Sequence, residues 1–322
     1  MIEDNTDLVS NQASDNWQKR FDRETYGFPS NKSVYDAEGR ELKLGSYDGK
    51  LVPPFGDRGF QQMRGLELRD DDILLCGYPK TGCHWTWEIL SMISRKQPQL
   101  SKLGKATAFL ELAPGQLMEE IPSPRVLNSH MWFDYLPRQI SYKMTKIILT
   151  VRNPKDTAVS YYNHHMALKA MQLYDGPFKD WFQLYMDGLV EYGDYFNYYQ
   201  DWDHVIKSNP DHPILVVNYE DMKEDLPREI RKIAKFLQIT LDDNLVEDIA
   251  IAAGFDVMKQ AYQNSNSVSK DLLRKGDVGD WKNWLTVAQS EVVDQAMATL
   301  QGTLFHKHRY TLRQKGSQTI LS

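Results

Sequence analysis

The segment DDILLCGYPKTGCHW, residues 71–85, joins a short apolar run to a turn that carries Lys80 and Thr81. The apolar run predicts a buried strand, and residues 85–93 have the apolar spacing of a helix. A strand that turns directly into a helix presents free backbone N–H groups, which form a natural cradle for an anion. Lys80 adds a positive charge to this cradle, and Thr81 adds a hydroxyl donor.

This segment does not match a Walker A loop. That motif, G-x-x-x-x-G-K-[ST], requires glycine at the two positions where this chain has Leu74 and Pro79. The alternative is a plain strand–turn–helix junction in which Lys80 is merely exposed. The segment alone does not decide between an anion site and such a junction.

Strands and helices alternate along the rest of the chain. Further strands are predicted at residues 125–128, 146–151 and 213–218, and further helices at 155–168 and 227–237. This alternation implies βαβ units and a parallel sheet with helices on both faces. We therefore predict one α/β domain over residues 51–310, an irregular N-terminal extension over 1–50 and a polar C-terminal tail over 311–322.

Composition and charge argue against a nucleic-acid partner and against a membrane-spanning helix. The chain has 322 residues and a net charge of −6, which argues against a nucleic-acid partner. It contains no apolar run of about 18 residues, so no membrane-spanning helix is expected. Two cysteines, Cys76 and Cys83, and an N-terminus without an apolar signal region predict a cytoplasmic protein in a reducing compartment.

Two later segments carry cations in similar positions. ILTVRNPKDTAVSYYNH, residues 148–164, is again a strand, a turn with Arg152, and a helix that offers Ser160 in its second turn. Since parallel strands end along one edge of a sheet, Arg152 and Lys80 are expected to face the same crevice. LLRKGDVGDWKNWLT, residues 272–286, brings a basic loop with glycines late in the chain. Taken alone, Arg152 would be explained by a surface ion pair, and the basic loop would be explained as an exposed turn.

Four segments together resemble the cytosolic sulfotransferases: YPKTGCHW, VRNPKDTAVSYY, YEDMKED and RKGDVGDWKN, in this order. The resemblance runs from about Leu51 to about Arg309. It implies a P-loop-like central parallel sheet flanked by helices. It also implies a donor, 3′-phosphoadenosine 5′-phosphosulfate (PAPS), whose sulfuryl group is transferred to a hydroxyl. No metal is expected, because lysine and backbone donors can stabilise the leaving group.

By this resemblance, the backbone of residues 79–84 cradles the 5′-phosphosulfate, with Lys80 at the bridging oxygen. Arg152, Ser160 and the loop 274–276 hold the 3′-phosphate, and aromatic rings surround the adenine. Donor binding is assigned in this way to Lys80, Thr81, Gly82, Cys83, His84, Trp85, Arg152, Ser160, Tyr219, Phe255, Arg274, Lys275 and Gly276. For the three aromatic residues of this set, ordinary core packing is the alternative.

The segment SPRVLNSHMWFDYLP, residues 123–137, resembles the family's segment that ends in Lys-Thr-His. The resemblance makes His130 the general base that takes the proton of the acceptor hydroxyl, and Lys80 its catalytic partner. An unperturbed histidine has a pKa near 6.5 and is mostly neutral at pH 7. Without the resemblance, a histidine beside aromatic residues would be interpreted as structural.

The chain departs from the family pattern at three places. Asn128 stands where the family usually has a lysine, two residues before the base, and this removes one cation from the reacting group. Cys83-His84 replaces a usual pair of threonines, so a hydroxyl donor is lost at each position. Ala253-Gly254 replaces hydroxyl residues that contact the nucleotide, and we assign neither a binding role.

The family's acceptor pocket is lined by segments near residues 52–60, 131–142 and 255–270. In this chain these segments are rich in aromatic side chains, which favour a flat aromatic or otherwise apolar acceptor. Core packing would select the same residue types. The aromatic residues concerned are Phe55, Phe60, Trp132, Phe133, Tyr135 and Tyr262.

The segment WKNWLTVAQSE, residues 281–291, matches the family's dimer motif K-x-x-x-T-V-x-x-x-E. The resemblance therefore implies a homodimer through Lys282, Thr286, Val287 and Glu291. A two-fold axis near the valine would set the lysine of one chain beside the glutamate of the other. The alternative is a loop followed by an amphipathic helix.

Three other functions stay open at this point. A P-loop kinase would use the same crevice, but the failed Walker count argues against it. A dehydratase of the same family, which sulfates an alcohol and then eliminates sulfate, would share every motif. A nucleotide-binding protein without turnover is suggested by Asn128 and disfavoured because His130 and Lys80 persist.

Overall fold

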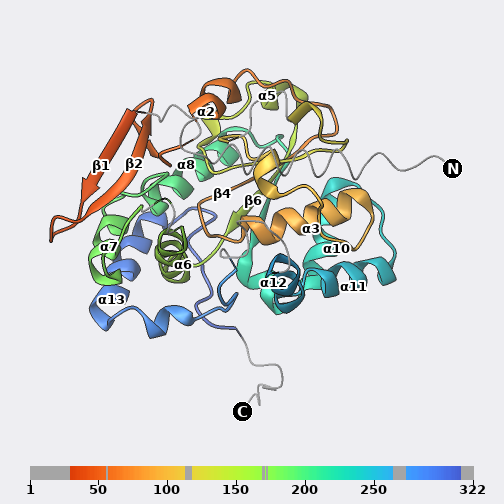
Figure 1. The fold of residues 1–322 in the computed structure, drawn as a ribbon. Helices are drawn as coiled ribbons and strands as arrows, with labels where there is room; N and C mark the ends of the chain where they lie inside the picture. Colours follow the sequence, from red (N-terminus) through yellow and green to blue (C-terminus); the bar gives the residue numbers. More distant parts are fainter. Residues whose placement is uncertain are drawn as a thin grey trace, which may run out of the picture.

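The computed structural model describes residues 30–55, 57–112, 118–168, 171, 173–263 and 273–312. At its centre lies a sheet of four parallel strands in the order β5-β4-β6-β7 (Figure 1). The strands are β4 (Ile73–Gly77), β5 (Val126–Ser129), β6 (Lys146–Val151) and β7 (Ile214–Asn218). All four predicted strands are confirmed, with ends shifted by one residue at most.

Helices cover both faces of this sheet. The helices are α2 (Asp57–Met63), α3 (Cys83–Arg95), α5 (Ile140–Lys143), α6 (Pro154–Ala167), α7 (Phe178–Met186), α8 (Tyr195–Ser208), α9 (Tyr219–Glu224), α10 (Leu226–Leu237), α11 (Asp243–Ala252), α12 (Phe255–Gln263) and α13 (Val287–Ala296). Short 3-10 turns are η1 (Lys105–Ala108), η2 (Phe133–Tyr135), η5 (Asp280–Asn283) and η6 (Met297–Leu300). α3, α10 and α11 pack together on one side of the sheet, and α6, α7 and α13 on the other (Figure 1). The predicted helices are confirmed as α3, α6 and α10.

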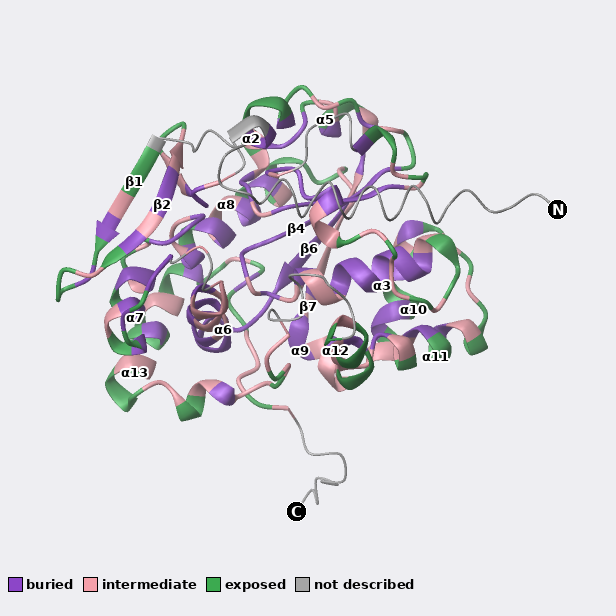
Figure 2. Ribbon diagram, in the orientation of Figure 1, coloured by how far each residue is buried: buried purple, intermediate pink, exposed green. Residues whose placement is uncertain are grey.

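The central strands are buried because both faces of the sheet are covered. Every residue of β4 is buried, as is every residue of β6 except its first, Lys146 (Figure 2). Such strands have no polar face, which explains why they are continuous apolar runs in the sequence. The carboxyl ends of β4, β5, β6 and β7 consequently meet at one edge, and the connections that leave this edge carry the candidate site residues.

The prediction of an irregular segment over residues 1–50 is wrong for its described part. β1 (Ser30–Tyr35), β2 (Glu41–Tyr47) and β3 (Lys50–Val52) form a separate antiparallel sheet, whereas residues 1–29 lie outside the described part of the chain. β2 alternates between buried leucines and more exposed residues, and Tyr47 pairs with Lys50 across a two-residue turn. The turn residues Asp48 and Gly49 have φ angles of 49° and 78°. Asp-Gly is a strong hairpin signal that the sequence analysis missed.

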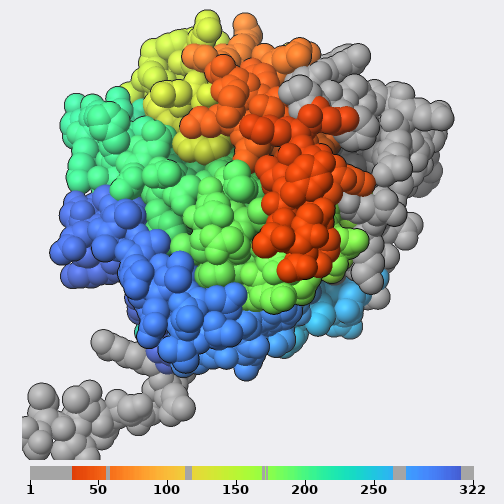
Figure 3. Space-filling model, turned by 90° about the vertical axis from the view of Figure 1, so that its left-hand side faces the viewer, coloured from red at the N-terminus to blue at the C-terminus, as the bar shows by residue number. Residues whose placement is uncertain are grey.

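This small sheet is bonded to the rest of the domain. The N–H of Lys43 donates to the carbonyl of Leu173 at 2.9 Å, and the N–H of Tyr192 donates to the carbonyl of Leu51 at 2.8 Å. In Figure 3 the sheet (red) lies on the surface against the green segment that contains α7. A boundary at residue 50 would cut the β2–β3 hairpin, so the strands belong to one structural unit with the segment after residue 50.

A buried ion pair joins the starts of β4 and β5. Arg125 donates to both carboxylate oxygens of Asp72, at 2.8 Å from Nε and 2.5 Å from Nη2. The side chains of Arg125 and Asp72 are 2% and 0% exposed. The same guanidinium donates to the carbonyls of Met118 and Glu67, so its charge is fully bonded inside the fold.

Replacing Asp72 with alanine should leave the buried Arg125 guanidinium without a counter-charge. We expect Asp72→Ala to lower the free energy of unfolding by about 3–5 kcal/mol, measured by urea denaturation. The matched control is Asp70→Ala, since the Asp70 side chain is 94% exposed and pairs with Lys143 at the surface. That control should lose less than about 1 kcal/mol. Equal losses in the two variants would contradict a structural role for the buried pair.

Candidate active site

The loop after β4 has the geometry of an anion cradle. Lys80 has a φ of 69° and Gly82 a φ of 102°, so the chain turns sharply before α3 begins at Cys83. A Cβ at Gly82 would lie 2.8 Å from the ring of Tyr219, so both the conformation and the space require glycine. The first N–H groups of α3 have no preceding helical carbonyl to bind, and the positive end of the helix dipole lies beside them.

The Thr81 hydroxyl does not face this cradle. It donates to the carbonyl of Tyr78 at 2.7 Å and lies 2.9 Å from the hydroxyl of Thr150. Thr81 is fully buried, so its side chain fixes the loop to β6. The sequence predicts a hydroxyl donor to the anion at this position, whereas the structure leaves Thr81 only its backbone for that purpose.

Two cations at this edge form no ion pair with any described residue, although the charge of Arg152 acts on the buried Glu220. Lys80 is half-buried and forms no side-chain bond to any described residue, and burial, with help from the nearby charges of Arg152 and Lys105, lowers its pKa to about 8. The guanidinium of Arg152 lies 4.2 Å from the ring centre of Tyr219, and its Nη2 donates to the carbonyl of Asp277 at 2.9 Å. Its buried Nε has no partner in the described structure. An anion would satisfy both groups.

The late basic loop is fixed beside Arg152. Asp156, in the first turn of α6, accepts hydrogen bonds from the N–H groups of Gly279 at 2.7 Å and Trp281 at 3.0 Å. Gly276 has a φ of 71°, and a Cβ there would lie 2.5 Å from the ring of Phe255. Glycine is therefore required where this loop meets α12.

The side chains of the basic loop already have an acid between them. Arg274 and Lys275 donate to Asp280 at 2.5 Å and 2.8 Å. Burial raises the pKa of Asp280, but hydrogen bonds from Lys275, Asn283 and Arg274 outweigh this effect and hold it well below its usual range. These two cations are thus positioned by Asp280, in contrast to Lys80 and Arg152.

The three expected adenine-site rings lie beside these cations. Tyr219 donates its hydroxyl to the carbonyl of Gly276 at 2.8 Å, and its ring packs on Trp85 with centroids 5.4 Å apart. Trp85 donates from Nε1 to the carbonyl of Ala253 at 2.8 Å, which links α3 to the end of α11. Phe255 contacts Gly276 as described above. The rings therefore connect the phosphate loop to the basic loop.

Ser160 occupies the predicted position in the second turn of α6. It is half-buried, and its hydroxyl has no bond to another residue in the described ranges. No contact links Ser160 to Arg152, so the structure leaves its hydroxyl free for a ligand without placing it against the other candidates.

His130 follows β5 and is held in one tautomer. Its Nδ1 lies 2.7 Å from the carbonyl oxygen of Gly77, which can only accept, so Nδ1 carries the proton and Nε2 has a free lone pair. Burial lowers the pKa of His130 to about 3, and the charges of Lys105 and Lys80 act in the same direction. The side chain is therefore a neutral imidazole with an available basic nitrogen.

Glu111 supports His130, and the sequence analysis missed it. Its Oε1 accepts from the N–H of His130 at 2.6 Å and from the hydroxyl of Ser129 at 3.1 Å. The carboxyl group is fully buried, and burial raises its pKa to about 7. A single acid within the apolar run Phe109-Leu110-Glu111-Leu112 was the available signal, because a buried carboxyl group needs dedicated partners.

His84 is bonded away from the loop, toward α12. Its Nε2 lies 2.8 Å from the hydroxyl of Tyr262, which in turn donates to Glu88. Burial lowers the pKa of His84 to about 3, with Lys105 and Lys80 acting in the same direction. Tyr262 was expected in the acceptor wall, and the structure places it against the phosphate-loop helix instead.

The other expected acceptor residues pack mainly in the core. Phe60 is 1% exposed and stacks on Tyr47, and Phe133 packs edge-on against Trp202. Trp132 is buried beneath Lys50, whose Nζ lies 4.3 Å from the ring centre. Phe55 is half-buried. Tyr135 donates to Asp48 at 3.2 Å, and residues 264–270 of the expected wall lie outside the described ranges.

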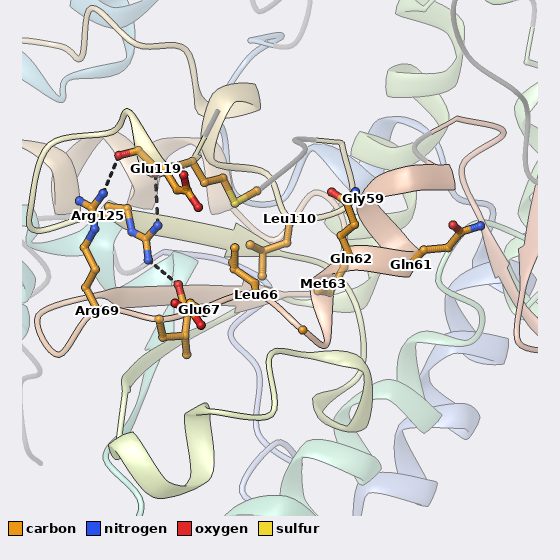
Figure 4. Close-up of a pocket in the computed structure, with 13 residues that line it drawn as sticks. Gly59, Gln61, Gln62, Met63, Leu66, Glu67, Arg69, Leu110, Glu119 and Arg125 are labelled. Atoms are coloured by element: carbon orange, nitrogen blue, oxygen red, sulfur yellow. Dashed lines mark hydrogen bonds between the residues drawn. The ribbon is translucent and has the colours of Figure 1, made fainter. Parts of the chain in front are cut away.

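A separate cavity of about 530 Å³ lies beside α2 (Figure 4). Its lining includes Gln62, Leu66 and Leu110, and at one end Arg69 and Arg125 donate to the carbonyls of Glu119 and Glu67. Its lining contains none of His130, Lys80 and Arg152, so it is distinct from the anion site.

The described residues contain no group of three or more histidine, cysteine, aspartate or glutamate side chains placed to hold a metal ion. Within the same ranges, every helix is too short or too polar to cross a lipid bilayer.

The fold and the site define an α/β enzyme with a P-loop-like anion crevice beside a neutral histidine. A sulfotransferase domain family model matches residues 70–308, and the chain belongs to the sulfotransferase family. Human sulfotransferase 1C2 is 33% identical over 276 residues, which cover 80% of this chain and 92% of the relative. Dog sulfotransferase 1B1 is 36% identical over 255 residues, which cover 73% and 85%.

Solved structures agree with this assignment. A mouse sulfotransferase, SULT7A1, was crystallised in complex with PAP; it is 27% identical and superposes with a TM-score of 0.70 over 82% of this chain and 97% of the other. A retinol dehydratase in complex with androsterone and PAP is 17% identical, with a TM-score of 0.65 over 86% and 97%, and this likeness supports the fold alone.

Proposed function

We propose that this protein transfers the sulfuryl group of PAPS to the hydroxyl of a small acceptor, and that the acceptor is aromatic or otherwise apolar. The observation that supports this most is a pair of cations, Lys80 and Arg152, that form no ion pair among the described residues and lie beside a cluster of aromatic rings. Two cations and a ring site match a nucleotide with anionic groups at both its 5′ and 3′ positions. PAP, in the mouse relative, is such a nucleotide.

In the proposed reaction, His130 Nε2 takes the proton of the acceptor hydroxyl while the acceptor oxygen attacks sulfur in line. Lys80 and the first N–H groups of α3 stabilise the charge that develops on the bridging oxygen as the S–O bond breaks. Gly77 holds the imidazole ring through Nδ1, so the basic nitrogen points away from the β4 backbone. Arg152, Ser160 and the loop 274–276 are assigned to the 3′-phosphate.

Replacing His130 should remove turnover and leave donor affinity nearly unchanged. We expect His130→Ala to lower kcat by roughly 10²–10⁴-fold with a phenolic acceptor, because general-base assistance is lost. The binding of PAP, measured by calorimetry, should stay within about threefold. The exposed His204 provides the control, since His204→Ala should retain wild-type activity. Near-normal activity of His130→Ala at neutral pH would refute the assignment.

Replacing Arg152 should discriminate between donors with and without a 3′-phosphate. A charge-assisted hydrogen bond is worth about 1.5–3 kcal/mol. We therefore expect Arg152→Ala to weaken PAPS by roughly 10–150-fold and adenosine 5′-phosphosulfate by much less. Calorimetry with both ligands provides the comparison. Equal weakening would show that Arg152 acts through its contacts with Tyr219 and Asp277 rather than through the phosphate.

We also propose that the chain forms a homodimer around Val287. This valine begins α13 and is 77% exposed, and Lys282 and Glu291 are exposed on either side of it. Thr286 caps the helix by accepting from the N–H of Gln289 at 3.2 Å, so the motif has a defined local geometry. Lys282 would meet Glu291 of the partner across the axis.

The Val287→Glu variant should be an active monomer, because it would set two like charges against each other at the axis. Light scattering at tens of micromolar provides the measurement, with the wild-type protein as the dimeric reference. A contact of this size falls below a standard stable interface, which is why we expect one substitution to be sufficient. A monomeric wild-type protein would refute the dimer, and a variant that stays dimeric would place the interface elsewhere.

A further inference from the structure

Lys105 is a cation at this site that belongs to none of the family motifs. It begins η1, in the connection between α3 and β5. Its Nζ lies 4.7 Å from the ring centre of Phe109, and that ring packs edge-on against His130 with centroids 5.3 Å apart. The ammonium group is therefore separated from the proposed base by a single aromatic ring.

Asn128 fixes the backbone of Lys105 against β5. The buried Asn128 side chain donates from Nδ2 to the carbonyl of Ala108 at 2.8 Å and to the carbonyl of Lys105 at 3.2 Å. The N–H of Leu110 donates to the carbonyl of Asn128 at 2.9 Å. These bonds hold η1 beside the strand that leads to His130.

Lys105 lies near enough to the phosphate loop and the base for its charge to act on both. Its charge lowers the pKa of Lys80, His84 and His130, in each case in addition to burial. Lys105 is half-buried, and among the described residues it forms no ion pair. Burial lowers its own pKa. Glu111 is the nearby acid, and its charge acts to raise the pKa of Lys105. Its Oε1 accepts from His130 and Ser129, and its buried Oε2 has no hydrogen-bond partner among the described residues.

We propose that Lys105 binds the non-bridging oxygens of the donor's sulfuryl group, opposite Lys80, and is a catalytic residue of the transfer. This inference rests on the proposed function and deepens it. It also explains Asn128: the cation that relatives are expected to carry on β5 is supplied here from η1, and the asparagine amide positions it. Asn128 is thus a positioning residue that acts through Lys105.

The role assigned to Lys105 is to align the reacting group. As the acceptor oxygen forms its bond to sulfur, the bond from sulfur to the bridging oxygen breaks, and His130 receives the hydroxyl proton. Lys80 stabilises the bridging oxygen, whose charge increases, while Lys105 holds the sulfuryl oxygens in the in-line orientation. The adenosine 3′,5′-bisphosphate product, PAP, lacks the sulfuryl group and makes no contact with Lys105.

The experiment compares PAPS with PAP. Lys105→Met removes the charge and keeps the length of the side chain over Phe109, and Lys105→Arg keeps the charge. We expect Lys105→Met to weaken PAPS roughly tenfold in calorimetry without acceptor, to leave PAP within about twofold, and to lower kcat roughly 100-fold. Lys105→Arg should recover most of the PAPS affinity. Lys235→Met, the same change on the exposed face of α10, is the control and should match the wild-type protein.

Each outcome decides the proposal. Equal weakening of PAPS and PAP by Lys105→Met, or an unchanged PAPS affinity, would overturn it, since a sulfuryl contact must separate these two ligands. The binding comparison needs no turnover, so it stands even where no acceptor is converted. Failure of the wild-type protein to transfer sulfate from PAPS to any of a panel of phenols and alcohols would instead refute the proposed function.

Discussion

Positive charge held partly out of water, with no ion pair to a carboxylate among the described residues, governs the arrangement of the site. Burial and the neighbouring charges of Arg152 and Lys105 lower the pKa of Lys80 to about 8. Moving an ion out of water costs several kcal/mol unless it is paired. These cations therefore favour the binding of an anion at the carboxyl edge of the sheet. Arg274 and Lys275 show the contrast, because Asp280 already lies between them.

Such a cluster persists only if the chain around it is rigid, and the turn after β6 provides that rigidity. The side chain of Asn153 caps α6 and donates to Glu220 at 2.9 Å, which fastens this turn to the start of α9, directly after β7. Asp156, in the same turn, holds the backbone of Gly279 and Trp281. One turn thus fixes three loops relative to one another, and Arg152 precedes it directly.

Much of this architecture follows from the sequence, because its signals are local. Buried parallel strands are continuous apolar runs, and the turns that follow β4 and β6 carry Lys80 and Arg152 at the strand ends, where the topology brings them to one edge. His130 could be assigned from its motif, but the sequence does not show that Gly77 fixes its tautomer.

The features that the sequence did not predict depend on contacts between distant segments. Lys105 and Glu111 lie in a connection without periodicity, and their importance depends on Asn128 and His130, about twenty residues further along the chain. The inward Thr81 hydroxyl depends on Thr150, a residue of another strand. Only the β2–β3 hairpin had a local signal, the Asp-Gly turn, and it lay in a segment whose polar composition suggested irregular structure.

The charges of Lys80 and Lys105 act on the pKa of His130. In the proposed reaction, donor binding therefore changes the base before the acceptor reacts. Without donor, burial and the charges of Lys105 and Lys80 lower the pKa of His130 to about 3, so the imidazole is neutral but weakly basic. An anion between those lysines offsets their charge, and an anion near a histidine raises its pKa. In the proposed reaction His130 therefore becomes a stronger base when the donor is bound. Because proton transfer is favoured as the pKa of the base approaches the operating pH, the donor itself prepares the group that activates the acceptor.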